Sequence, residues 1–82
     1  MSEIKKRLID KLVEFLNRNS ILPTTIHLTA EEERDLQSLT HDDAGAFAAE
    51  IRHKGARRAI NERGNTLLGL RVVWDAPEFR IE

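Results

Sequence analysis

The spacing of the apolar residues changes along the chain, and this change limits the fold more than any other feature. In residues 2–18, large apolar side chains recur every three or four positions, as on one face of an amphipathic helix. In residues 24–28, 70–75 and 79–82, apolar and polar side chains alternate, which is typical of half-buried strands. Both periods within 82 residues predict a single small α+β domain over residues 1–82.

The first helix is expected over residues 2–18. Ser2 is a suitable N-cap, Glu3 is a favourable charge for the first turn, and Pro23 prevents the helix from continuing. Its apolar face carries seven large side chains: Ile4, Leu8, Ile9, Leu12, Val13, Phe15 and Leu16. A face this wide predicts more apolar surface than a small sheet covers.

Two more helices are expected in the middle of the chain. Thr29 and Thr40 each begin a capping-box pattern, with an acidic residue three positions later, and they predict helices over 30–39 and 42–54. Gly55 lies where the second of these helices ends or kinks. The last third of the chain then contributes two strands, which gives the order α-β-α-α-β-β.

The expected sheet has three strands. The crossover from the first strand to the second carries the middle helices, so these two strands are expected to lie side by side and parallel. The strands over 70–75 and 79–82 flank a turn that contains Pro77, and they are expected to form a C-terminal antiparallel hairpin. Helices packed on one face of the sheet complete the predicted architecture.

Acidic and basic residues are arranged in blocks that nearly cancel. The net charge is −1, yet residues 31–50 hold seven acidic and one basic side chain, and residues 51–63 hold five basic and one acidic. A near-neutral total disfavours non-specific binding to nucleic acid or to anionic membranes. No apolar run is long enough to cross a bilayer, and no signal-peptide core follows the basic N-terminus, so we expect a cytoplasmic location.

The side chains needed for catalysis or metal binding form no recognisable pattern. Cysteine is absent, which excludes disulfides, thiolate zinc sites and thiol nucleophiles. His27, His41 and His53 have none of the spacings of metal-binding motifs, and we interpret them as ordinary surface or capping residues. No serine lies in a nucleophile-elbow motif. We therefore expect a protein that is not an enzyme, with no cofactor and no small-molecule substrate.

A basic cluster in the second half of the chain supports an alternative hypothesis. Arg52, Lys54, Arg57 and Arg58 are candidates for contacts with phosphates, and the two middle helices superficially resemble a helix-turn-helix. The second of these helices begins with small and acidic residues, which offer few hydrogen bonds to base edges and repel phosphates. Nucleic-acid binding is therefore the second hypothesis, against a basic segment that simply pairs with the acidic one.

The wide apolar face of the first helix favours an interaction function. Leu8, Leu12, Phe15 and Leu16 are predicted to form core or an interface with a protein partner or a second copy of the chain. A small chain without disulfides or metal ligands also gains stability from oligomerisation. The last strand, over 79–82, offers an edge for pairing as well.

Two strand segments resemble those of small uncharacterised proteins of tailed phages and prophages. Residues 23–29 match a Pro-x-x-Ile-x-Leu strand, and residues 66–75 match a late strand of the form apolar-Gly-apolar-x-Val. The resemblance covers about half of the chain and implies a viral or prophage origin and a non-enzymatic role. We therefore predict a phage or prophage accessory protein that acts through protein–protein contact, with a homodimer as its simplest form.

Overall fold

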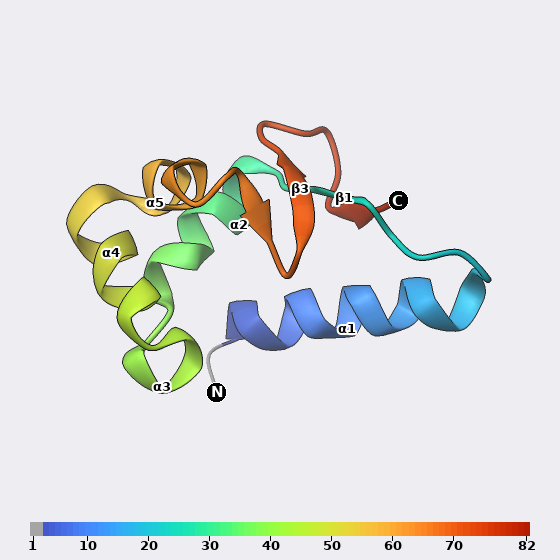
Figure 1. The fold of residues 1–82 in the computed structure, drawn as a ribbon, viewed down its shortest axis with the longest axis horizontal. Helices are drawn as coiled ribbons and strands as arrows, with labels where there is room; N and C mark the ends of the chain where they lie inside the picture. Colours follow the sequence, from blue (N-terminus) through green and yellow to red (C-terminus); the bar gives the residue numbers. More distant parts are fainter. Residues whose placement is uncertain (1–2) are drawn as a thin grey trace.

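A computed structural model of the chain describes residues 3–82, so the expected N-cap Ser2 lies outside the described residues. Helices and strands follow one another within this part as α1 Glu3–Arg18, β1 Thr25–His27, α2 Ala30–Asp35, the 3-10 helix η1 Leu36–Ser38, α3 His41–Ala44, α4 Ala46–Lys54, α5 Ala56–Glu62, β2 Thr66–Leu67, β3 Leu70–Val73 and β4 Arg80–Ile81. The predicted α+β class is confirmed, with helices packed against a small sheet (Figure 1).

The strands form one mixed sheet in the order β2-β3-β1-β4. β1 and β3 pair in parallel, with Ile26 opposite Val72, as the crossover predicts. The sheet has one strand more than expected, because β2 turns back onto β3 through Leu68 and Gly69. Both turn residues have positive φ, +54° and +78°, which is the backbone conformation of the tightest hairpin turns.

The expected C-terminal hairpin between β3 and β4 is wrong. β4 pairs antiparallel with β1, where His27 lies opposite Arg80. Both edges of β3 are already paired, one with β2 and the other with β1, so β4 has no free edge of β3 to pair with. After β3 the chain instead passes the end of β1, where the Ala76 backbone N–H donates to the Leu28 carbonyl at 3.0 Å.

Glycines divide the middle of the chain into shorter helices than expected. The predicted helix 42–54 is broken into α3 and α4 at Gly45, whose φ of +57° and ψ of −138° suit glycine and no other residue. The end expected at Gly55 is present, with φ +93° and ψ 152°, and it separates α4 from α5. The capping boxes at Thr29 and Thr40 both form, which confirms the two predicted helix starts.

One face of the sheet is buried and apolar, and the other is polar. Ile26 and Val72 are at most 3% exposed, whereas Arg71 and Arg80 are exposed on the opposite face. The helices supply the rest of the core. Its buried apolar side chains are Ile4, Leu8, Ile26, Leu28, Leu36, Leu39, Ala48, Ile51, Ala56, Ala59, Ile60, Leu70 and Val72.

Helix α1 lies along one side of the molecule and is only partly covered. Figure 1 shows that its last turns and the segment after it extend past the sheet. Within α1 the buried side chains are Ile4 and Leu8, both in its first half. No helix within residues 3–82 is long and apolar enough to cross a membrane.

Candidate functional site

The second half of α1 leaves a row of apolar side chains uncovered. Ile9, Val13 and Leu16 are 37%, 48% and 46% exposed. Their spacing of four and then three residues places them in one row on the helix. We call these three residues the α1 face.

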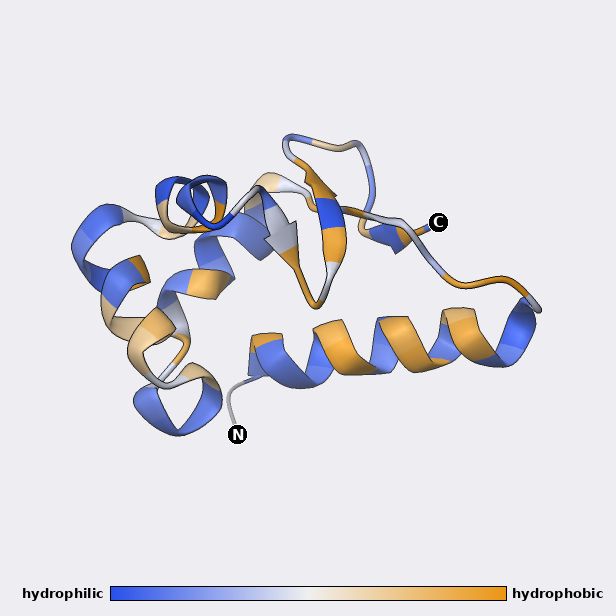
Figure 2. Cartoon of the chain, viewed as in Figure 1, coloured by the Kyte–Doolittle hydropathy of each residue, from blue (hydrophilic) through white to orange (hydrophobic). Residues whose placement is uncertain are grey.

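The segment after α1 exposes two more large apolar side chains. Ile21 and Leu22 are 68% and 81% exposed, and we call this pair the arm. Figure 2 shows the apolar bands along α1 and the apolar segment that continues from its end. No charged residue occurs in residues 19–25, so the arm and its flanks are uncharged.

Of the four residues predicted to form core or an interface, some are buried in the core and others are exposed. Leu8 is 4% exposed and belongs to the core, so it is not available to a partner. Leu12 and Phe15 are partly buried, and Leu16 is exposed. Ile9 and Val13 belong to the same stripe in the sequence. They are exposed because they lie on the flank of α1 that faces away from the core.

An apolar groove of about 450 Å³ lies beside the first half of α1. Its lining comes from α1, α3, α4, β2, the β2–β3 turn and the segments before α3 and after α5. It includes the apolar Leu8, Phe47 and Leu68 and the charged Lys5, Asp43 and Arg63, and the Arg63 guanidinium lies 4.6 Å from the centroid of the Phe47 ring. Leu68 is 47% exposed and therefore borders the groove without filling it. We call this hollow the α1 groove.

Arg57, one of the four basic residues considered for nucleic-acid binding, is already engaged within the chain. It donates to Glu33 at 2.6 Å and to Asp75 at 3.0 Å. Its guanidinium also lies over the Trp74 ring, 5.1 Å from the ring centroid. These hydrogen bonds to the carboxylates, the one to Glu33 first and the one to Asp75 second, raise the pKa of Arg57 above its ordinary value.

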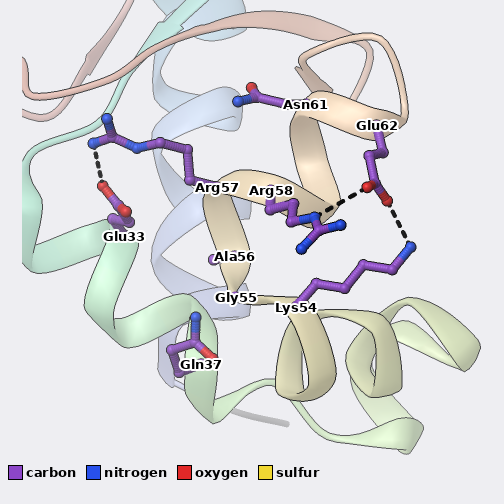
Figure 3. A pocket seen from close by; sticks show the side chains of 9 residues that line it. All are labelled: Glu33, Gln37, Lys54, Gly55, Ala56, Arg57, Arg58, Asn61 and Glu62. Atoms are coloured by element: carbon purple, nitrogen blue, oxygen red, sulfur yellow. Dashed lines mark hydrogen bonds and ion pairs between the residues drawn. The ribbon is translucent and has the colours of Figure 1, made fainter.

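The other basic residues of the cluster lie around the start of α5. Lys54 and Arg58 both donate to Glu62, and these hydrogen bonds hold the pKa of Glu62 below its ordinary value. Arg52 is exposed on α4. An open hollow of about 560 Å³ lies at this place. Figure 3 shows the side chains of Lys54, Arg57 and Arg58 turned toward carboxylates.

The acidic and basic blocks of the sequence meet in two places. Arg57 of α5 pairs with Glu33 of α2, and Arg63 pairs with Glu50 of α4 at 2.8 Å. The basic segment therefore pairs in part with the acidic one. This is what the sequence analysis expected if the basic residues do not bind nucleic acid. This arrangement leaves little uncompensated positive charge for an anionic partner.

Glu32 is a buried charged residue that the sequence pattern did not indicate. Its side chain is 2% exposed and accepts hydrogen bonds from the Thr29 backbone at 2.9 Å and from Arg7 at 2.7 Å. Burial acts to raise the pKa of Glu32, but the hydrogen bonds from Thr29 and Arg7 outweigh it and hold the pKa below its ordinary value. Arg7 also bonds Asp35 at 3.0 Å, so this cluster ties α1 to α2.

The histidines lie apart from one another in the sheet and in two helices. His27 bonds Glu82 at 2.8 Å across the polar face of the sheet, while His41 and His53 are exposed on α3 and α4. In the described part of the chain, no three histidine or carboxylate side chains gather as metal ligands would.

Comparisons with family models, curated proteins and solved structures found no match to this chain.

Proposed function

We propose that the protein is a small accessory protein, of the phage or prophage kind that its strand segments resemble, and that it acts through protein–protein contact. The contact uses the α1 face and the arm. The observation that carries the proposal is the exposure of five large apolar side chains in one region of a small chain. Exposed apolar patches of this kind mark interaction surfaces, and depletion of charge is typical of the core of an interface.

The nucleic-acid alternative draws less support. Lys54, Arg57 and Arg58 already hold carboxylates of the same chain, so binding to phosphates would have to displace those ion pairs. Of the four candidates, Arg52 alone would contribute without such an exchange. A gel shift at low salt that is lost in the double variant Arg57→Glu/Arg58→Glu would decide for this alternative.

The proposal is tested by placing a photo-reactive amino acid at position 13, in the middle of the α1 face. We expect protein adducts at this position in cells that express the chain. The same residue at Ala49, which is exposed on α4, is the matched control and should give few adducts. Equal adduct yields at both positions, or none at position 13, would contradict the proposal.

A further inference from the structure

Resting on the proposed function, we infer that the partner is a second copy of this chain. The two copies bind through antiparallel α1 helices, and the arm of each copy sits in the α1 groove of the other. Within residues 3–82, the surface carries a groove with apolar walls and an exposed apolar arm beside the α1 face. One is hollow and the other protrudes, so they match in shape and in chemistry.

The arm cannot reach the groove of its own chain. The groove lies beside Lys5 and Leu8 in the first half of α1, whereas the arm follows the end of the helix at Arg18. A continuous helix holds these places apart, and 13 residues of helix span about 20 Å. An arm that fills such a groove must therefore come from another molecule.

The spacing along α1 fits a two-fold axis that passes between Leu12 and Val13. About this axis Ile9 of one copy lies opposite Leu16 of the other, so the exposed row pairs with itself. At a rise of about 1.5 Å per residue, Leu8 and Lys5 beside the groove lie about 7–11 Å from the axis on one side. The end of α1 at Arg18, from which the chain continues into the arm, lies about 8 Å from the axis on the other side. The same rotation therefore brings arm and groove together twice, as an isologous interface requires.

The distribution of charge favours the antiparallel arrangement over the parallel one. Lys5, Lys6 and Arg7 form a basic run at the start of α1, and a parallel pair would bring the two runs together. Like charges placed opposite each other suppress association. In the antiparallel pair, Lys5 and Lys6 of one copy instead lie opposite the uncharged Ser20 and Asn19 of the other. Arg7 is held by Glu32 and Asp35 of its own chain.

The backbone at Leu68 is a second, independent observation on the groove. Leu68 has φ +54° at the first central position of the β2–β3 turn, where asparagine or glycine is the ordinary residue. A bulky residue in this conformation is strained, and such strain is found where a side chain serves a contact. A leucine here extends the apolar wall of the groove, which an asparagine would not do.

A stable dimer also needs a larger buried area than the α1 face alone provides. An ordinary stable interface buries about 800 Å² on each partner. The 16 residues of α1 form a rod about 24 Å long, and a single face of it is narrower than such an interface. Arm and groove supply the remaining contact, once at each end of the dimer.

The arrangement is tested by thiol cross-linking, for which a chain without cysteine is well suited. Protein carrying Leu22→Cys is mixed with protein carrying Leu68→Cys and treated with a short thiol–thiol cross-linker. We expect efficient cross-linking between the two variants and little within either one alone. Leu22→Cys mixed with Ala49→Cys is the matched control. Efficient cross-linking of Leu22→Cys with itself would indicate a parallel pair and overturn the inference.

Sedimentation of the unmodified chain provides the second measurement. We expect a monomer–dimer equilibrium that Leu22→Glu weakens at least tenfold and that Ala49→Glu leaves unchanged, since both sites are exposed in the single chain. A monomer at every concentration would overturn the inference. If the adducts formed at position 13 then contain a different protein, the proposed function stands without the homodimer. If position 13 gives no adducts, both fail.

Discussion

Among single residues, Glu32 has the most unusual position, because it is a carboxylate buried at the junction of two helices. It serves as the capping-box acid of α2 and as the partner of Arg7 from α1 at the same time. A local cap therefore also fixes a contact between elements that are distant in the sequence. The covered half of α1 is held in part by this pair, which leaves the α1 face free on the other side.

We expect Glu32→Gln to lower the free energy of unfolding at neutral pH by about 1–3 kcal/mol. Glutamine keeps the cap but removes the charge that pairs with Arg7. The folded-state pKa of Glu32 lies below its ordinary value of 4.5, so its stabilisation is present above that value and is lost as the pH falls through the folded-state pKa. Urea unfolding at neutral and acid pH measures both effects.

The matched control for this change is Glu31→Gln, one position earlier in the same helical turn. Glu31 is exposed, so its loss should cost little and leave the acid dependence unchanged. The same loss of stability in both variants would show that the charge of the first turn, and not the buried pair, is what matters.

Among the elements, the short helices α3, α4 and α5 depend on two glycines whose backbone excludes other residues. Gly55 has φ +93° with an extended ψ of 152°, a region that is essentially restricted to glycine. It lets α4 end and α5 start in a new direction, and buried Ala56 and Ala59 can then pack against the core.

We expect Gly55→Ala to destabilise the fold by about 1–3 kcal/mol, because the added Cβ forces a strained backbone. The space around the site is not limiting, since an added Cβ would meet no atom closer than 4.0 Å. Gly64→Asn is the matched control, because asparagine tolerates the left-handed conformation at the end of α5, where φ is +87°. Urea unfolding of both variants makes the comparison, and equal losses would contradict this account.

For the molecule as a whole, the sequence predicts what depends on local pattern and misses what depends on competition between distant segments. The capping boxes and the parallel pair of β1 and β3 follow from spacing and from the crossover. The place of β4 does not, because it depends on β2 having already taken the free edge of β3. The burial of Glu32 is missed for the same reason, since Arg7 reaches it from another helix.

The candidate site could also be predicted from the sequence only in part. The stripe on α1 is visible in the sequence, but which of its residues are covered depends on the rotation of the helix against the sheet. Leu8 therefore lies in the core, while Ile9 is exposed beside it. The arm gave a weaker signal, because two apolar residues before Pro23 look like the approach to a strand. The groove gave none, because its walls come from elements spread over most of the chain.

The structure shows how the acidic and basic blocks are arranged, which the net charge alone does not indicate. Arg57 with Glu33 and Arg63 with Glu50 are surface ion pairs, which add little to stability. They join α5 to α2 and the residue after α5 to α4, and they leave the molecule without a large field of one sign. An interaction through apolar contacts is then not opposed by long-range repulsion between like copies.

The inferred dimer predicts that the stability of the fold depends on protein concentration. Association removes folded monomer from the unfolding equilibrium, so a concentrated solution should melt at a higher temperature than a dilute one. The fluorescence of the single tryptophan, Trp74, is a suitable probe, because this side chain is partly buried and donates to Asn65 at 3.0 Å. We expect the dependence to shift to at least tenfold higher protein concentration in Leu22→Glu and to remain unchanged in Ala49→Glu. A melting temperature that is the same at all concentrations of the unmodified chain would show that the monomer is the complete folding unit.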